Sequence, residues 1–472
     1  MKKTSLSLLM LATLSMFLGA CSVQYAPGKS KLSGSTNPEP AAPVDLHNLV
    51  SIAVSPTNPS VFMSETVQFH ALGTYSNNTT ADLTNAVTWS SSDTTNASIT
   101  AGALATGLNI GYSTIKATVG TISGSTTLKV KTQVLYLPGD AGVISMYEID
   151  HNTGQLSFIP PQVILPVGSA IRGIELHPNG EYAYVSYTNT TGSFIDTFAI
   201  NQKTGFLTQI DSLQVSFELI DFKVDSSGHW LFATTLTNDF IKFEILANGL
   251  LQTISYGLMG GGNCGGLCSV VFLTFHPSEP ILYLNKVLDH LVESYRLDSV
   301  TGNLVSLGSP VASVSGTLEL VVNPTENVMY MVSNDNGTIS IFLLTSNHSI
   351  GNLLNTYNTV SNSMRIGISH SKNRLHVLGV AGTIAHHNIT GQSISALGTQ
   401  VPTGMGSWAM TYDPMGKFLY VPCTGDNKIY TYSVDGNTGE LSNFLPPTPA
   451  VVPMINDWSS IVVTATIPGG GI

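Results

Sequence analysis

Polar and aromatic side chains recur at the entry to a series of short apolar strands. They are Arg172, Glu218, Cys268, Arg365 and Trp408, with Asp457 and Trp458 before the last strand. Arginine and aromatic groups gathered on one face form a binding patch for a polar ligand. The alternative is that each side chain fills a central channel or caps its own strand. Both interpretations require strands that begin at one common face.

Those strands belong to a repeat. The phrase HPNGEYAYV at 177–185 recurs as DPMGKFLYV at 413–421. A Thr-Gly-x-Leu turn, or an altered version of it, follows each copy. Seven such turns run from Thr153 to Thr438, about 47 residues apart, which is the period of a four-stranded propeller blade. The phrase supplies a tight turn between apolar strands, so His177 and His276 are predicted to be turn formers and not catalysts.

The ends of the repeat predict a closed ring. The first copy begins at Val134–Leu137 without an inner strand before it, and SSIVVT at 459–464 is a strand with no blade after it. We expect the last strand to complete the first blade, which removes two exposed sheet edges. The neighbouring His386 and His387 lie on a strand, where adjacent side chains point to opposite faces, so they are not expected to share a metal ion.

A smaller domain precedes the ring. From 49 to 131 the pattern is short alternating strands with turn residues every eight to twelve positions, which is typical of a β-sandwich. Ile52–Pro56, Thr88–Ser91 and Gly111–Ala117 resemble the bacterial immunoglobulin-like domain of group 2. That resemblance implies a spacer or adhesive module at a cell surface, with Trp89 in its core.

The N-terminus carries an export signal. Lys2 and Lys3 precede an apolar stretch of about a dozen residues, and Leu18, Gly19, Ala20 and Cys21 form a bacterial lipobox. We expect acylation of Cys21, with an ordinary signal peptide and a chance cysteine as the alternative. Ser22 after the cysteine favours the outer membrane, on a side that the sequence does not specify.

Four segments follow from these patterns. They are a signal peptide at 1–20, a lipidated cysteine and flexible tether at 21–47, the immunoglobulin-like domain at 48–132 and the propeller at 133–467. The expected fold class is all-β, an immunoglobulin-like β-sandwich followed by a seven-bladed β-propeller.

Charge and cysteine content exclude several functions. The chain has 18 Lys and Arg against 29 Asp and Glu, and residues 133–467 have 11 against 24, so no basic footprint for nucleic acid exists. Cys264 and Cys268 in GGGNCGGLC are expected to form a loop disulfide, with two free thiols as the alternative, and Cys423 is left over. The spacing offers no zinc site, and no cofactor is expected.

The blade phrase resembles one propeller family. DPMGKFLYV followed by NKIYTYSVDGNTGEL is similar to blades of the seven-bladed lactonase family, which includes 6-phosphogluconolactonases and carboxymuconate cyclases. The resemblance implies Arg-His before a His-Pro turn and Glu after the next strand. In this chain Val271 and Phe272 occupy the positions where the resemblance implies Arg and His, and Lys286 occupies the position where it implies Glu. An earlier blade keeps the arginine as Arg172 but has Gly173 at the histidine position.

The leading expectation is therefore an envelope-anchored lipoprotein whose propeller binds or scaffolds protein or glycan without catalysis. Arg172, Glu218, Arg365, Trp408 and Trp458 are the channel-mouth candidates, and Arg172 is the candidate for a catalytic residue. The alternative is a lactonase of the 6-phosphogluconolactonase-like type with a rearranged site. A third possibility is a purely structural propeller.

Overall fold

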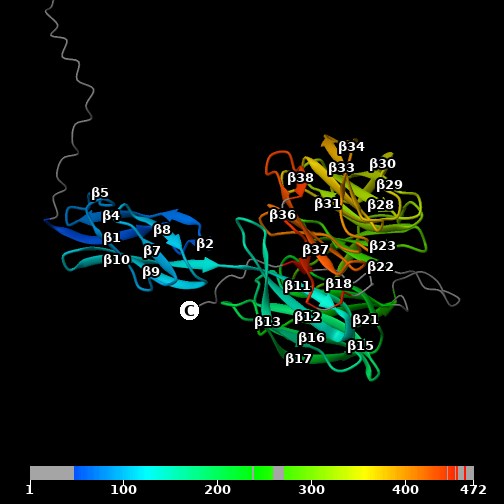
Figure 1. The fold of residues 1–472 in the computed structure, drawn as a ribbon, viewed down its shortest axis with the longest axis horizontal. Helices are drawn as coiled ribbons and strands as arrows, with labels where there is room; N and C mark the ends of the chain where they lie inside the picture. Colours follow the sequence, from blue (N-terminus) through cyan, green and yellow to red (C-terminus); the bar gives the residue numbers. More distant parts are fainter. Residues whose placement is uncertain are drawn as a thin grey trace, which may run out of the picture. The chain divides into compact units, whose positions relative to one another are not determined.

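Short runs of alternating apolar residues form strands in the described part of the chain (Figure 1). The computed structural model describes residues 47–235, 239–258, 271–443, 445–451, 453–454 and 462–463. Within these ranges the one helical element is η1, a single 3-10 turn at Asp140–Gly142. The all-β prediction is confirmed. No helix in the described ranges is both long and apolar enough to cross a membrane.

The first ten strands form the sandwich. They are β1 (Leu49–Ser55), β2 (Ser60–Phe62), β3 (Thr66–Gln68), β4 (His70–Tyr75), β5 (Thr80–Asp82), β6 (Thr88–Ser91), β7 (Ala97–Ile99), β8 (Leu104–Gly107), β9 (Gly111–Val119) and β10 (Ile122–Lys131). They pair in the orders β1-β4-β5, β2-β10-β9-β6 and β3-β8-β7. Trp89 lies in the core as expected, 6.2 Å from the ring of Phe69, and its Nε1 donates to the Thr84 carbonyl at 2.9 Å.

Seven antiparallel sheets follow within the described residues, one for each predicted blade. Blade 1 contains β40 (Val462–Val463), β11 (Gln133–Gly139), β12 (Val143–Ile149) and β13 (Leu156–Ile164). Blade 2 contains β14 (Ala170–Leu176), β15 (Tyr182–Asn189), β16 (Gly192–Ile200) and β17 (Leu207–Val215). Blade 3 contains β18 (Leu219–Val224), β19 (Trp230–Thr235), β20 (Asp239–Ile245) and β21 (Leu251–Leu258).

The other four blades have the same order. Blade 4 contains β22 (Val271–Phe275), β23 (Ile281–Lys286), β24 (Leu291–Leu297), β25 (Leu304–Ser306) and β26 (Val311–Ala312). Blade 5 contains β27 (Thr317–Asn323), β28 (Val328–Ser333), β29 (Thr338–Leu344) and β30 (Ile350–Asn358). Blade 6 contains β31 (Ser363–Ile368), β32 (Arg374–Gly379), β33 (Thr383–Thr390) and β34 (Ser393–Pro402). Blade 7 contains β35 (Thr411–Tyr412), β36 (Phe418–Cys423), β37 (Lys428–Val434), β38 (Leu441–Asn443) and β39 (Thr448–Pro449).

The last described strand closes the ring as the sequence predicts. β40 pairs antiparallel with β11, with Val463 opposite Leu135 and Val462 opposite Tyr136. It therefore supplies the inner strand that blade 1 lacks at its own start. Because this C-terminal strand joins the sheet of the first blade, the inner edge of β11 is paired within the chain.

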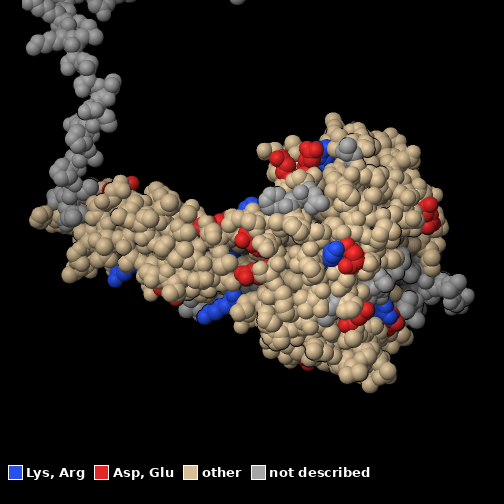
Figure 2. Space-filling model, in the orientation of Figure 1, with Lys and Arg blue, Asp and Glu red and all other residues tan. Residues whose placement is uncertain are grey.

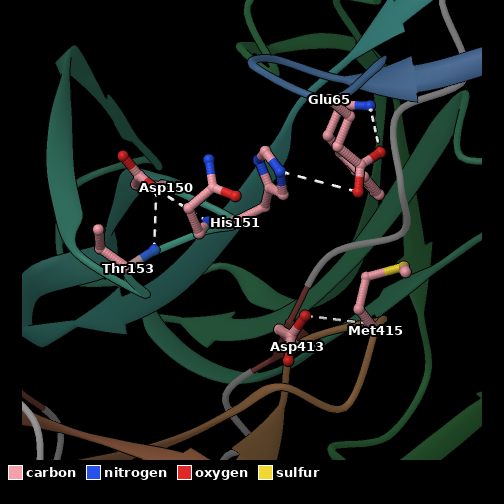
Figure 3. Close-up of polar contacts among 8 residues, drawn as sticks. Glu65, Asp150, His151, Thr153, Asp413 and Met415 are labelled. Atoms are coloured by element: carbon pink, nitrogen blue, oxygen red, sulfur yellow. Dashed lines mark hydrogen bonds and ion pairs between the residues drawn. The ribbon is translucent and has the colours of Figure 1, made fainter. Parts of the chain in front are cut away.

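Aspartate side chains build the turns of the repeat (Figure 3). In the Thr-Gly-x-Leu turn after β12, one Asp150 oxygen accepts from the backbone N–H of Asn152 at 2.9 Å and of Thr153 at 3.0 Å. In the turn before β36, Asp413 accepts from Met415 N–H at 3.0 Å. These contacts satisfy backbone donors within a tight turn. The repeated phrase is therefore scaffold, and the His177 and His276 rings contribute in the same way, each accepting from its own turn.

A buried aromatic position joins each blade to the next. The seven equivalent residues, at most 1% exposed, are Tyr136, Tyr184, Phe232, Tyr283, Tyr330, His376 and Tyr420. Four of the tyrosines donate to a carbonyl in the outer turn of the following blade. The pairs are Tyr136 to Gly205 at 2.7 Å, Tyr184 to Gly249 at 3.0 Å, Tyr283 to His348 at 2.8 Å and Tyr420 to Gly154 at 3.1 Å.

Removal of one of these hydroxyls should destabilise the ring. In Tyr184→Phe the buried Gly249 carbonyl loses its donor, so we expect the free energy of unfolding to fall by about 1–3 kcal/mol. The urea-unfolding midpoint measures this change. Tyr182→Phe, on the same strand but half-buried, is the matched control. Equal midpoints for the two variants would contradict the role of the inter-blade hydrogen bond.

Blade 6 carries three buried histidines, of which His376 contacts blade 7 through Tyr412 and His387 contacts Thr359, on the segment that joins blades 5 and 6. The rings of His376 and His386 are 5.0 Å apart, and His376 Nδ1 hydrogen-bonds the Tyr412 hydroxyl. His387 Nε2 lies 3.0 Å from the Thr359 hydroxyl. Burial lowers the pKa of His376 to about 3, helped by repulsion from His386, and lowers the pKa of His386 and His387 to about 4. The folded protein therefore holds these histidines neutral at pH values where the unfolded chain protonates them.

This cluster should weaken the fold in mild acid. Because the folded pKa values lie below the ordinary value of 6.5, the unfolded state binds more protons and stability falls as pH drops from about 6.5 toward 4. Each histidine contributes at most about 1.4 kcal/mol per pH unit. As the pH is lowered from 7.5 to 5, we expect the free energy of unfolding to fall more in the wild type than in His386→Leu, because the variant lacks one of the buried histidines. A pH-independent difference would refute this expectation.

The difference between the two proteins is the quantity to measure. Burial raises the pKa of other groups, such as Asp196, and the stability contribution of these carboxyls changes with pH in the opposite sense. Subtraction of the variant's unfolding free energy from that of the wild type removes their contribution. His70→Leu, in the exposed part of β4, is the surface control.

Candidate functional site

The first strands of the blades surround a central cavity. Successive first strands contact one another, β14 with β18, β18 with β22, β22 with β27 and β27 with β31. The cavity has a volume of about 400 Å³ and is lined by residues from six blades between Arg172 and Met410. That volume lies within the roughly 300–1,000 Å³ of small-molecule sites.

A β-bulge recurs at the start of these strands. The pairing register shifts between Ile171 and Gly173, Leu219 and Asp221, Thr317 and Glu319, and Ser363 and Arg365. A bulge sets two residues opposite one, so it interrupts the alternation of side chains between the two faces. Consecutive residues such as Arg172 and Gly173, or Leu318 and Glu319, accordingly both line the cavity.

Lys223 is the centre of the charge cluster in the cavity. Its Nζ lies 3.0 Å from Glu175 Oε2 on the neighbouring blade, and the two side chains are 30% and 18% exposed. Burial alone lowers the pKa of Lys223, but Glu175 and Asp221 together raise it above the ordinary value. Burial raises the pKa of Glu175, and Lys223 opposes that rise. The pair places a basic carboxylate beside a permanent cation.

Two other carboxylates hold neighbouring blades together. Asp221 Oδ2 accepts from the Leu273 N–H of the next blade at 2.8 Å, and Glu319 Oε2 accepts from the Ile366 N–H of its next blade at 2.7 Å. Burial raises the pKa of both carboxyls, against attraction from Lys223 at Asp221 and from Arg365 at Glu319. Because both carboxylates satisfy strand N–H groups at the axis, they have a structural role in addition to any role toward a ligand.

The arginines of the cavity also have acidic neighbours. Arg172 Nη2 lies 2.6 Å from Glu218 Oε1, in an ion pair with both side chains about one-third exposed. Arg365 lines the cavity from β31, where its Nη1 donates to the Met364 carbonyl at 3.2 Å. The cavity thus combines cations with carboxylates in close pairs, on a protein with few charged side chains on the face in Figure 2.

The channel-mouth candidates from the sequence lie at different distances from this cavity. Arg172 and Arg365 line it, and Glu218 reaches it through the ion pair with Arg172. Trp408 is half-buried, and the cavity lining includes its neighbours Ala409 and Met410. Trp458 lies outside the described residues.

The remaining predicted positions are mostly outside the described ranges. Cys264 and Cys268 fall there, as do Cys21 and the lipobox residues Leu18, Gly19 and Ala20, so these predictions stay predictions. Cys423 is a buried free thiol, with its Sγ 3.3 Å from the Ser407 hydroxyl. Burial raises the pKa of that thiol.

Positions implied by the family resemblance are found where the repeat predicts them. Phe272 lines the cavity, so the position expected for histidine does face the channel. Lys286, at the position expected for glutamate, is buried, and its Nζ lies 2.7 Å from Glu293 Oε1. Among the described residues no histidine lines the cavity.

Sequence reasoning missed Glu175, Asp221, Lys223 and Glu319, which carry most of the cavity's charge. Glu175 and Lys223 lie two residues before the turn position that recurs in each repeat, and Asp221 and Glu319 lie four residues before it. Counting back from each turn by alternate residues finds all four. The candidates named from the sequence are strand-entry residues. A bulge at the start of these strands puts them out of step with the alternation of side chains that continues to the turn.

The described part of the chain contains no group of three or more His, Cys, Asp or Glu that could hold a metal ion. His386 and His387 contact different neighbours, His376 and Thr359. Adjacent strand residues thus point apart, as the sequence predicts.

Two family models match this chain. Residues 49–130 match the bacterial Ig-like domain of group 2, and residues 262–453 match "Lactonase, 7-bladed beta-propeller". The predicted recognition of both families is confirmed on these segments.

Solved structures share the propeller fold. A protein from Bacteroides uniformis, named as a candidate 6-phosphogluconolactonase, aligns with a TM-score of 0.61 and 14% identity, over 71% of this chain and 99% of that chain. The periplasmic gluconolactonase of Pseudomonas aeruginosa aligns with a TM-score of 0.59 and 14% identity, over 71% and 99%. At these identities the likeness establishes the fold alone.

One curated relative matches the first domain. Ice-binding protein 1 of Shewanella frigidimarina is 42% identical over 87 residues, which are 18% of this chain. The match spans only 10% of that relative's length, so it relates a single module of the two proteins.

Proposed function

We propose that the propeller is a lactone hydrolase whose reaction takes place in the central cavity. The observation that carries the proposal is the Glu175–Lys223 pair, which combines a carboxylate of raised pKa with a cation in the central cavity. The match of residues 262–453 to the lactonase family supports the same reaction class. Arg172 is one of several cavity cations in this proposal, and Glu175 replaces it as the principal candidate for catalysis.

Glu175 acts as the general base. It takes a proton from water as the water oxygen bonds to the lactone carbonyl carbon, and it returns that proton to the ring oxygen when the ring C–O bond breaks. A carboxyl whose pKa is raised by burial is a stronger base than an exposed one. Lys223 and Arg365 supply positive charge for the oxygen that becomes negative during the attack.

Lactone hydrolysis by the full chain tests this function. We expect ring opening of δ-lactones above the spontaneous rate, and a fall in kcat of about 10²–10⁴-fold in Glu175→Gln, because the amide no longer accepts the proton. Glu440→Gln, in the exposed turn after β37, is the matched control. Turnover at the spontaneous rate by a folded wild-type protein would reject the hydrolase proposal.

A second candidate is ligand binding without turnover, for a protein or glycan partner. The observation that favours it is the engagement of Asp221 and Glu319 with strand N–H groups, together with Phe272 at the position where the family implies histidine. In this case the cavity would hold a polar group of the partner, and Glu175→Gln would change affinity only.

The location at the cell envelope stays a proposal that rests on the sequence. Leu18, Gly19 and Ala20 before Cys21 support an acyl anchor, and the segment at 21–47 supports a tether between the anchor and the folded domains. A purely structural propeller is the third proposal, and the bonds that Asp221 and Glu319 accept from strand N–H groups of the next blade support it.

Metabolic labelling with palmitate tests the anchor. We expect label on the wild-type chain and none on Cys21→Ala, since the cysteine sulfur is the acylation site in a lipobox. Cys423→Ala, which removes a buried thiol, is the control and should keep the label. Label retained in Cys21→Ala would exclude this anchor.

A further inference from the structure

The cations that line the cavity are neutralised by carboxylates. Arg172 lies 2.6 Å from Glu218, and Lys223 lies 3.0 Å from Glu175. Arg365 is close enough to Glu319 for its charge to oppose the burial-driven rise in the pKa of that carboxyl. Each of the three cavity cations in the described residues therefore already faces an acid.

The carboxylates also outnumber the cations. Against Arg172, Lys223 and Arg365 stand Glu175, Glu319 and the Glu218 partner of Arg172, with Asp221 in addition. The whole propeller has the same imbalance, with 11 Lys and Arg against 24 Asp and Glu in residues 133–467. A phosphate monoester carries a charge of about −1.5 to −2 at neutral pH, and it needs cations that are free to pair with it. This cavity opposes such a group.

We infer that the substrate is an uncharged, polyhydroxylated lactone and that the cavity discriminates against its phosphorylated counterpart. This inference rests on the proposed hydrolase function. Paired carboxylates accept hydrogen bonds from sugar hydroxyls, and the guanidinium and ammonium groups donate to hydroxyl and carbonyl oxygens. Hydrolysis converts the neutral lactone into a carboxylate anion, which the excess of acidic groups repels, so the same charge pattern favours release of the product.

Glu218 is the specificity-determining residue in this arrangement. It lies beside the cavity and neutralises Arg172, one of the three cations of the lining. Glu218→Gln keeps the shape and the hydrogen-bonding capacity of the side chain but removes its charge. The variant therefore exposes a ligand to the positive charge of Arg172.

The first measurement compares D-glucono-1,5-lactone with its 6-phosphate on the full chain. We expect kcat/KM at least tenfold higher for the uncharged lactone in the wild type, and a preference reduced at least fivefold in Glu218→Gln. Glu440→Gln makes the same change in net charge at an exposed turn and should keep the wild-type preference. Equal or higher kcat/KM for the phosphorylated lactone overturns the inference and leaves the hydrolase function in place.

The second measurement is calorimetric binding of D-glucono-1,5-lactam and its 6-phosphate, which are not hydrolysed as lactones are. Tighter binding of the uncharged lactam, with the difference reduced in Glu218→Gln, supports the charge discrimination even if neither lactone turns over, in which case the hydrolase proposal alone fails. Equal or tighter binding of the phosphorylated lactam overturns the inference. Failure of both lactams to bind and of both lactones to react overturns it together with the proposed function.

Discussion

The contact between an aromatic side chain of one blade and the outer turn of the next is the constraint on which the propeller depends. Gly154 has φ of +72°, and a Cβ there would lie 2.4 Å from the Phe418 ring, so the turn requires glycine for both conformation and space. Tyr420, two residues after Phe418, donates to the Gly154 carbonyl. Gly249 meets Tyr182 and Tyr184 in the same way. The repeat is therefore a repeat of an inter-blade contact.

Blade 3 makes this junction with different atoms. Blade 3 has Phe232 at the tyrosine position, so it lacks the hydroxyl, and Trp230 takes over by donating from Nε1 to the Ser299 carbonyl at 2.9 Å. Lys242 lies 5.0 Å from the same indole ring and donates to the Thr301 carbonyl at 2.9 Å. Substitution at one position is tolerated because a neighbouring side chain satisfies the same turn. At blade 3 the junction is thus filled, and its turn carbonyls are satisfied, by residues other than the recurring tyrosine.

The fold was predictable because its signals are local and repeated. Turn residues such as Asp413 and the glycine of Thr153–Leu156 identify each blade independently, and an unpartnered strand at each end predicts the closure that β40 makes with β11. The site was predictable only in part. Arg172 and Arg365 line the cavity, but Glu175 and Lys223 meet across two blades, and no local pattern links residues that are 48 positions apart. The bulges lie at the strand entries, so they separate Arg172 and Glu218 from the alternation that assigns the faces of Glu175 and Lys223.

The same geometry explains how a scaffold that needs acids at its axis can also carry chemistry. Asp221 and Glu319 occupy one level of the channel, where each satisfies an N–H of the following blade, and this requirement keeps negative charge inside the ring. Lys223 lies beside Asp221 and Glu175, so the charge that compensates one structural carboxylate also holds Glu175, which itself accepts a backbone hydrogen bond from Val224 of the next blade. A change at Lys223 would therefore disturb the ring and the proposed base together. Glu218, outside this network and paired with Arg172, is the position at which selectivity can change while the axis is preserved.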